Sequence, residues 1–229
     1  MKIVLLATTS LFALCVSSLG PASAAPRSFT HSVGHARYAV SASPGSVTLY
    51  DQYADIGLNV SSQNFEASYA EYDSAGADDF TVPAGHTWKI KEVDVSGFEY
   101  DGDGPADSEN VTFYDSTVSP PYLPNNIIAA CIGVQGIDNF GPMAIAIPKT
   151  CKAKLKGGQR YWVSVVANMH FFQKGQWFWN TRNPINAPGV WENPANGFGT
   201  GCTTWTQTSA CQPTGDDYSF LLKGKDVVR

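Results

Sequence analysis

The chain has 229 residues, of which 43% are hydrophobic, 12% aromatic and 15% charged, and its formal net charge is −5. This apolar and aromatic content excludes a chain that is disordered throughout. The acidic balance gives no basic footprint for nucleic acid or an anionic membrane, so we expect neither as a partner. Gly and Pro, 21 and 14 residues, are spread along most of the chain and argue against long helices.

Residues 1–25 have the pattern of a removable export signal. Lys2 supplies a positive charge, Ile3–Leu19 is an apolar stretch, and Ala22-Ser23-Ala24 is an A-x-A cleavage signal. No later stretch of 18 apolar residues follows, so we expect a secreted mature chain that does not insert into a membrane, with the periplasm as an alternative location. A transmembrane anchor, or a lipid anchor at Cys15, is a less favoured alternative.

Residues 26–44 are rich in Ser and Ala and lack periodicity, which predicts a flexible linker. We expect one domain, over residues 45–224, after this linker, and a short tail at residues 225–229. Short apolar runs separated by turn residues predict an all-β antiparallel sandwich of jelly-roll type. The expected strands are Val47–Tyr50, Asp79–Val82, Trp88–Val95, Phe98–Tyr100, Val111–Asp115, Ile127–Ile132, Met143–Ile147, Tyr161–Ala167, Gln176–Asn180 and Tyr218–Lys223.

Two segments carry more local detail. In the run 88–95, Trp88 and Ile90 share one side-chain phase while Val93 and Val95 share the other, which predicts a β-bulge between them. In the segment 62–73, aromatic residues recur at the spacing i, i+4 and i+7, which predicts a short helix.

Four cysteines follow the leader, namely Cys131, Cys151, Cys202 and Cys211. An even number of cysteines in an exported chain indicates two disulfides. Three pairings are open, and we favour sequential pairing because each such pair brackets a short segment. A zinc site made of four thiolates is disfavoured because no C-x-x-C spacing is present.

Several segments resemble a widespread set of secreted bacterial β-sandwich modules, found alone or appended to extracellular hydrolases, especially proteases. The segments are DQYADIGLNVSSQNFEASYAEYDSAGADDFTVPAGHTWKI, ADSENVTFYDS, YWVSVVANM, QWFWNTR, GFGTGCTTWTQTSAC and DDYSFLLKG. The resemblance runs from about residue 49 to 224 and implies a secreted β-sandwich, without an established biochemical activity. It favours the pair Cys202–Cys211, which lies inside a shared segment.

Four tryptophans fall within a short C-terminal stretch, interleaved with amide and guanidinium side chains. Flat aromatic faces stack on sugar rings, while amide and guanidinium groups bind hydroxyls. We expect Trp177 and Trp179, which lie in a strand, to be core residues. Trp191 and Trp205 lie in Gly/Pro/Asn-rich loops, where an exposed aromatic is suited to binding. The predicted ligand-binding residues are Trp191, Trp205, Arg182, Asn193 and Asn196.

Two acidic groups could bind Ca²⁺, which takes six to eight oxygen ligands. The first is a Gly-rich loop whose predicted metal ligands are Asp101, Asp103, Asp107 and Glu109. The second joins residues near both ends of the domain, namely Asp78, Asp79, Asp216 and Asp217. A solvated acidic turn is the alternative for both groups, because Asp and Gly are ordinary turn formers.

Evidence for catalysis is weak, and we predict no catalytic residues. Glu92 and Asp94 share one strand face, as in some β-sandwich glycosidases, but Gly97 occupies the position of the third acid. The sequence therefore favours a secreted, non-catalytic binding module for a carbohydrate or a cell-surface polymer. The alternatives are a structural or protein-interaction role outside the cell, and a hydrolase acting on glycans.

Overall fold

The computed structural model describes residues 25–30, 45–53, 56–102, 104–138, 141–184, 186–214 and 217–228. Most of these residues lie in strands, and each of the ten expected strands overlaps a strand of the structure. The expected strand Tyr218–Lys223 is divided at Ser219 between two strands. The leader, up to residue 24, and residues 31–44 of the expected linker lie outside the described residues. No helix in the described part of the chain is long and apolar enough to cross a bilayer.

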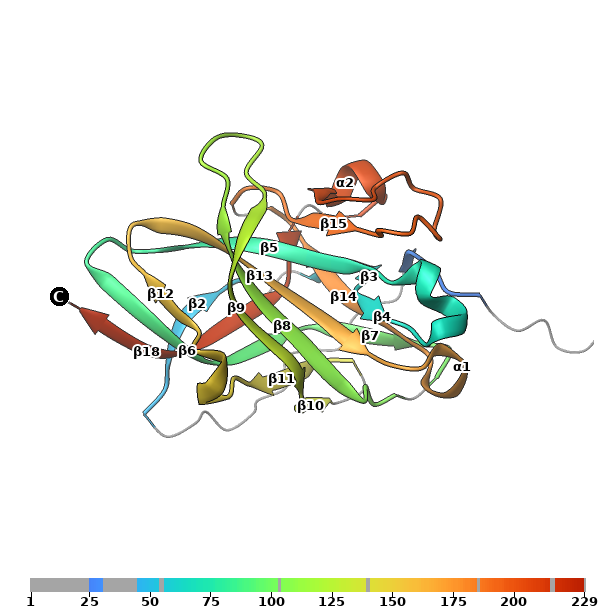
Figure 1. Ribbon diagram of the computed structural model, residues 1–229, viewed down its shortest axis with the longest axis horizontal. Helices are drawn as coiled ribbons and strands as arrows, with labels where there is room; N and C mark the ends of the chain where they lie inside the picture. The colour runs from blue at the N-terminus through green and yellow to red at the C-terminus, as the bar shows by residue number, and fades with distance from the viewer. Residues whose placement is uncertain are drawn as a thin grey trace, which may run out of the picture.

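One layer of the fold is a seven-stranded sheet, called here the large sheet. Its strands are β4 (Gln63–Asn64), β5 (Ala75–Val82), β8 (Ser108–Ser116), β9 (Pro124–Val134), β13 (Gln159–Asn168), β15 (Val190–Glu192) and β16 (Thr206–Gln207). The order is β16-β15-β5-β13-β8-β9, with β4 pairing parallel to β13 and the other pairs antiparallel. Figure 1 shows β5, β13, β8 and β9 side by side.

Two smaller sheets make the other layer. The six-stranded sheet holds β2 (Val47–Asp51), β6 (His86–Val95), β10 (Gly136–Asp138), β11 (Met143–Ala146), β12 (Lys154–Lys156) and β18 (Phe220–Val228). The five-stranded sheet holds β1 (Phe29–Thr30), β3 (Ile56–Ser61), β7 (Gly97–Tyr100), β14 (Gln176–Arg182) and β17 (Asp217–Tyr218). All their pairs in the described chain are antiparallel.

Three polar residues join these two sheets into one bent layer. The Ser96 N–H donates to Ser219 O at 3.1 Å, the Ser219 N–H to Asn180 O at 2.9 Å, and the Asn180 N–H to Ser96 O at 3.0 Å. Ser96 is the single residue between β6 and β7, and Ser219 is the single residue between β17 and β18. At both points the chain therefore passes directly from one of the smaller sheets into the other.

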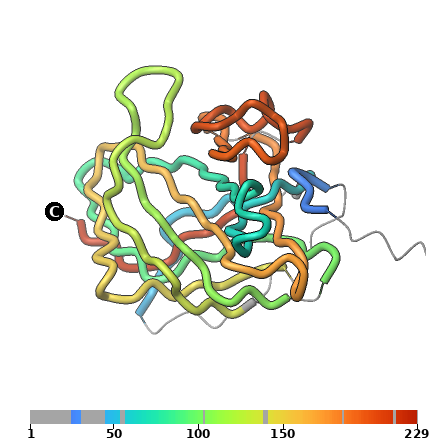
Figure 2. Tube along the Cα trace, turned by 45° about the vertical axis from the view of Figure 1, so that its right-hand side comes forward, coloured from blue at the N-terminus to red at the C-terminus, as the bar shows by residue number. Residues whose placement is uncertain are grey.

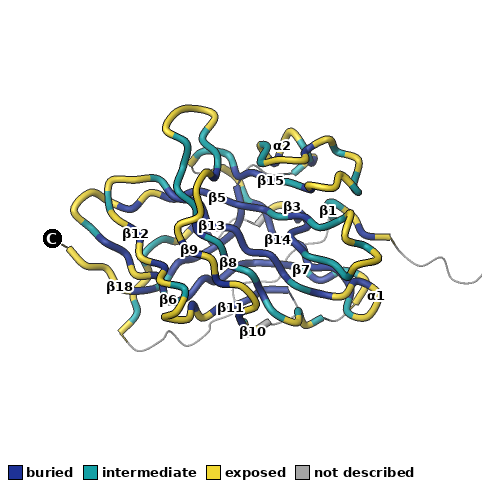
Figure 3. Tube along the Cα trace, viewed as in Figure 1, coloured by how far each residue is buried: buried dark blue, intermediate teal, exposed yellow. Residues whose placement is uncertain are grey.

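The main core lies between the two layers and is rich in aromatic rings. Phe80 of the large sheet stacks on Trp88 at a centroid distance of 6.1 Å and meets Phe220 edge-on at 6.3 Å. Trp177 and Trp179 are fully buried in the same core, as expected. Each ring buried in this way contributes roughly 1.5–3 kcal/mol of hydrophobic stabilisation. Figure 3 shows the buried positions concentrated in the central strands.

The expected β-bulge in the 88–95 strand is confirmed. Glu92 pairs with Lys223 while Ile90 pairs with the next residue of β18, Gly224. The strand β6 therefore contains one extra residue, Lys91. This extra residue moves Val93 and Val95 onto the core face, which Trp88 and Ile90 also occupy.

The structure corrects both ends of the expected domain. Residues 26–30 do not form a linker, because Phe29 and Thr30 pair with β3 and the Arg27 N–H donates to Gln176 Oε1 at 2.8 Å. Residues 225–228 of the expected tail extend β18, whose pairing with β6 continues to Val228, and Arg229 lies outside the described residues.

Four short helices connect the strands of the described chain. They are η1 (Ala67–Tyr72), η2 (Lys149–Cys151), α1 (Phe171–Lys174) and α2 (Thr208–Cys211). The helix expected in 62–73 is thus present as the 3₁₀ helix η1. Its rings pack against α1, with Tyr69 and Phe171 at a centroid distance of 5.4 Å.

The four cysteines in the described part of the chain form one disulfide. Cys202 and Cys211 are bonded, as the resemblance implied. Cys131 and Cys151 are unbonded but hydrogen-bond to each other, so the expected second pair lies in contact.

Candidate functional site

Trp191 does not have the position expected for a sugar-stacking residue. Its side chain is fully buried in the main core, and its indole Nε1–H donates to Ser61 O at 2.8 Å. The segment rich in Gly, Pro and Asn places Phe198 beside the ring, at a centroid distance of 6.0 Å. Trp191 therefore presents no ring face to a ligand, which corrects the prediction.

The three polar residues predicted to bind a ligand instead form hydrogen bonds within the protein. Asn193 is buried, and its amide donates to Glu71 O and Asp73 O, each at 2.8 Å. Asn196 is exposed, but its Oδ1 accepts from the Gly201 N–H at 2.8 Å. Arg182 is half-buried and donates to Gln52 O at 3.0 Å. The polar side chains proposed to bind a ligand are therefore engaged in contacts within the protein.

Trp205 belongs instead to a second aromatic group on the large sheet. Its ring is half-exposed and meets the Tyr114 ring edge-on at a centroid distance of 5.9 Å. Trp205, Tyr114 and Tyr122 pack around the fully buried Trp162. We call these four residues the aromatic cluster. It combines two strand residues with two loop residues.

The register of the large sheet places this cluster on its outer face. Trp162 pairs directly with Tyr114 on one side and with Asp79 on the other, and paired residues share a face. Their chain neighbours Phe113 and Val163 belong to the main core, so the cluster faces away from the second layer. Figure 2 shows the β8–β9 loop and the segment that contains Cys202 and Cys211 both projecting at the top of the view.

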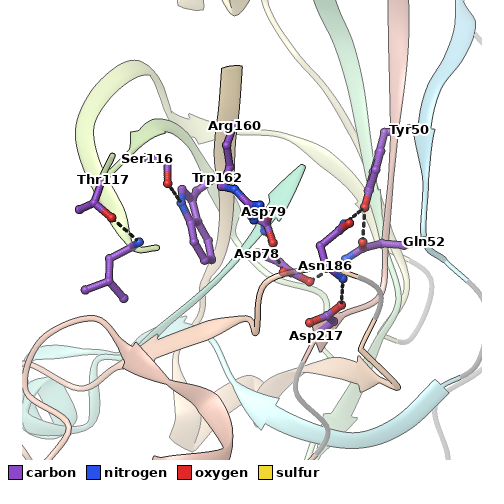
Figure 4. Close-up of polar contacts among 11 residues, drawn as sticks. Tyr50, Gln52, Asp78, Asp79, Ser116, Thr117, Arg160, Trp162, Asn186 and Asp217 are labelled. Carbon is purple, nitrogen blue, oxygen red and sulfur yellow. Dashed lines mark hydrogen bonds and ion pairs between the residues drawn. The ribbon is translucent and has the colours of Figure 1, made fainter. Parts of the chain in front are cut away.

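Polar contacts fix the loop that carries Tyr122 (Figure 4). The Trp162 Nε1–H donates to Ser116 Oγ at 3.2 Å, and the Leu123 N–H donates to Thr117 Oγ1 at 3.0 Å. Arg160 lies over the Tyr122 ring at 4.4 Å and forms an ion pair with Asp79. The aromatic cluster is therefore bordered by a guanidinium group that is itself held in place.

Glu192 borders the cluster on its other side. Its half-buried carboxylate accepts a hydrogen bond from the backbone of Trp205, and its charge acts on Tyr114. Burial raises the pKa of Glu192 to about 7, although this hydrogen bond lowers it. The site thus has a cation on one side and, near neutral pH, a partly ionised carboxyl on the other.

Three buried carboxylates lie below this surface. Asp78 Oδ2 accepts from Gln52 Nε2 and from the Tyr218 N–H, both at 2.6 Å, and Asp217 accepts from the Asn186 N–H at 3.3 Å. Burial raises the pKa of Asp78 well above its usual value, and burial raises that of Asp79 to about 7 despite Arg160. Figure 4 shows Asp78, Asp79 and Asp217 close together.

The second predicted calcium group is nevertheless not arranged as a metal site. Asp78 and Asp79 are successive residues of β5, so their side chains leave on opposite faces. Asp79 instead meets Arg160 on the outer face. No group of three metal-ligating side chains occurs within the described ranges, and Asp216 lies outside them.

The acidic residues of the first predicted calcium loop lie in different surroundings. Glu109 is buried and accepts from the Gly136 N–H at 2.6 Å, whereas Asp107 is exposed and binds Lys174 at 2.5 Å. Asp101 is exposed, and Asp103 lies outside the described residues. Glu109 and Asp107 thus have partners of their own, and calcium binding here remains a prediction.

The carboxylates of the hydrolase alternative are bound to a lysine. Lys223 Nζ lies 2.6 Å from Glu92 Oε1 and 2.5 Å from Asp94 Oδ2, and both acids are buried. Neither carboxylate is open to a glycan in this arrangement.

Sequence reasoning missed Tyr114, Tyr122, Arg160 and Glu192. The outward phase of Tyr114 could be read from the alternation in Val111–Asp115, and Arg160 lies just before the strand expected at 161–167. Their proximity to Trp205 depends on the strand order β15-β5-β13-β8, which no local pattern predicts.

Compared with known proteins, the chain matches no family model, no curated protein and no solved structure.

Proposed function

We propose that this protein is a secreted, non-catalytic binding module whose ligand is a carbohydrate or another cell-surface polymer. The observation that carries the proposal is the half-exposed ring pair Trp205 and Tyr114, between the charged side chains of Arg160 and Glu192. Trp191, Arg182, Asn193 and Asn196 are replaced as binding residues by this group.

The chemistry of the aromatic cluster suits a sugar ring. Ring faces offer apolar area to the C–H faces of a pyranose, while a guanidinium and a carboxylate bind its hydroxyls. Binding sites generally combine such apolar lining with a few fixed polar groups. The contacts of Arg160 with Asp79 and Tyr122 hold its side chain before a ligand arrives, which limits the entropy lost on binding.

A protein-interaction role is the second candidate, favoured by exposed apolar side chains on two successive edge strands. Four isoleucines on these strands are 42–68% exposed, namely Ile127, Ile128 and Ile132 of β9 and Ile137 of β10. Exposed apolar side chains that gather into one patch mark interaction sites. The pairing of β8 with β9 contains register shifts, which turn neighbouring side chains of β9 outward. Such irregularities make it less favourable for a partner to add a strand to the edge of the sheet at β9.

We also propose two finer features of the fold. The first is jelly-roll connectivity, supported by β18 pairing with both β2 and β6 and thereby joining the two ends of the domain. The second is a disulfide between Cys131 and Cys151, supported by their contact and by the export signal expected at residues 1–25.

The first experiment is retention of the disulfide-intact chain on insoluble polysaccharides, with and without EGTA. We expect retention on at least one polymer, and at least tenfold weaker binding for Trp205→Ala, about 1.4 kcal/mol, because truncated aromatic anchors often cost this much. Loss of retention with EGTA would support the calcium prediction.

The matched control is Phe172→Ala, which removes a ring that is 76% exposed on α1, away from the aromatic cluster. This variant should bind as the unchanged chain does. Equal retention of Trp205→Ala and the unchanged chain would refute the aromatic cluster as the site. No retention on any polymer would move the assignment to the protein-interaction role.

A further inference from the structure

Lys223, Glu92 and Asp94 form a compact buried triad on the outer face of the six-stranded sheet. Lys223 pairs directly with Glu92 across β18 and β6, and Asp94 lies two residues farther along the same face. The Lys223 Nζ is 2.5 Å from Asp94 Oδ2 and 2.6 Å from Glu92 Oε1. The exposed fractions of the side chains are 13% for Lys223, 10% for Asp94 and 5% for Glu92.

The two carboxyl groups also contact each other. A hydrogen bond joins the Asp94 and Glu92 side chains, which requires a proton on one of them. Asp94 Oδ1 is buried and receives no hydrogen bond from any described donor. Burial raises the pKa of Asp94 to about 6, although Lys223 lowers it. The Asp94 carboxyl is therefore readily protonated.

Burial lowers the pKa of Lys223, but the hydrogen bonds to Asp94 and Glu92 raise it overall, so the resting Lys223–Asp94 pair is charged and the reaction starts from a minor neutral form. A proton that moves from the ammonium to the carboxylate converts an ion pair into a neutral amine beside a carboxylic acid. The net charge is unchanged, and a site shielded from water lowers the cost of this transfer. The neutral amine is a nucleophile, and the acid carbon is its nearest electrophile.

We propose that Lys223 and Asp94 condense to form an intramolecular isopeptide bond, with Glu92 as the catalytic proton-transfer residue. The Lys223 Nζ attacks Asp94 Cγ and forms a C–N bond. Glu92 accepts a proton from Nζ and returns it to a carboxyl oxygen of Asp94. The C–O bond then breaks, and one water molecule leaves. No atom changes oxidation state, so no oxidant or reductant is required.

Proximity lowers the barrier to this reaction. The fold holds the amine and the acid in contact, which replaces a bimolecular encounter by an intramolecular step with a high effective concentration. The product would tie β18, the last strand, to the central strand β6. Such a bond resists reducing agents, unlike the disulfide, and would suit a protein exposed to the extracellular environment.

An ordinary buried ion triad makes the same contacts, so the decisive readout is mass. The full chain is produced with its leader, purified under native conditions, reduced and digested. We expect one species in which the peptides containing Asp94 and Lys223 are joined and lighter by one water molecule. In a denaturing gel, the cross-linked chain should migrate faster than an unlinked variant.

Variants assign the roles. Glu92→Gln and Lys223→Arg should give unlinked peptides in a chain whose circular dichroism is unchanged. Asp94→Asn should still form the same linked product, with ammonia leaving in place of water. The matched control Lys225→Arg alters an exposed lysine of the same strand and should keep the bond. Unlinked peptides from the folded, unchanged chain would overturn the proposal.

Discussion

Asn180 shows how a single amide connects two sheets. Its side chain donates to Ser96 Oγ at 2.6 Å and accepts from the Asn59 amide, and all three residues are fully buried. Replacing Asn180 by Ala removes the hydrogen bonds that its side chain makes with Ser96 and Asn59. Because buried polar groups left unsatisfied cost about 1–3 kcal/mol each, we expect Asn180→Ala to lower the free energy of unfolding by about 3 kcal/mol.

Urea unfolding followed by tryptophan fluorescence measures this loss. The matched control is Asn125→Ala, at an exposed position of β9, which should change the free energy of unfolding by less than about 0.5 kcal/mol. An equal, small effect of both variants would show that the junction amide does not hold the two sheets together.

The tryptophans also show what single residues reveal in a sequence. Trp177 and Trp179 could be assigned to the core because they lie in a strand between other apolar residues. Trp191 could not, because its neighbours are typical of a loop. Its burial depends on the pairing of β15 with β5, which brings it over Ser61 of a distant strand.

At the scale of elements, the alternation of apolar and polar side chains predicted local strand geometry where the strand was long. The change of phase in β6 predicted its bulge because period two is strict on a pleated strand. The two-residue strands β1, β4 and β16 have too few side chains to show a period. The hydrogen bonds that define these strands come from tertiary contacts.

The contact between η2 and β9 leads to a prediction about the second cysteine pair. Cys131 lies on β9 and Cys151 ends η2, and the two thiols already hydrogen-bond. Burial raises the pKa of the Cys131 thiol well above its usual value, so thiolate chemistry is slow once the protein has folded. We therefore expect the disulfide to form during oxidative folding.

Peptide mapping without reductant checks this prediction. Joined peptides containing Cys131 and Cys151, and no free thiol beyond the leader, are the expected result. The paired variant Cys131→Ala, Cys151→Ala should lose about 3 kcal/mol of stability, because the bridge closes a loop of about 20 residues. Free thiols at both positions in the natively secreted protein would contradict the second bridge.

At the scale of the whole molecule, the architecture was more predictable than the site. An all-β antiparallel fold follows from the spacing of short apolar runs, since each run can pair only with another strand. The aromatic cluster instead combines β8, β13 and two loops that are distant along the chain. Assembling such a site requires the strand order, which the alternation within each strand does not contain.

The buried carboxyls give the molecule an unusual dependence on pH. Burial raises the pKa of both Asp79 and Glu192 to about 7 and raises that of Asp78. In the unfolded chain these groups titrate near pH 4. Between about pH 4 and pH 7 the folded state therefore binds more protons than the unfolded state. The free energy of unfolding should consequently fall as pH rises through this range.

For Asp79 alone, we expect the free energy of unfolding to fall by about 2.5 kcal/mol between pH 5 and pH 8. The reason is that each pH unit over which the folded state binds one extra proton changes the free energy of unfolding by about 1.4 kcal/mol. Urea unfolding at both pH values measures it. Asp79→Asn, which stays neutral, should reduce the difference, whereas Asp107→Asn, at an exposed carboxylate, should leave it unchanged. Stability that rises from pH 5 to pH 8 would mean that the native fold holds these carboxyls ionised, with Arg160 outweighing the cost of burial at Asp79.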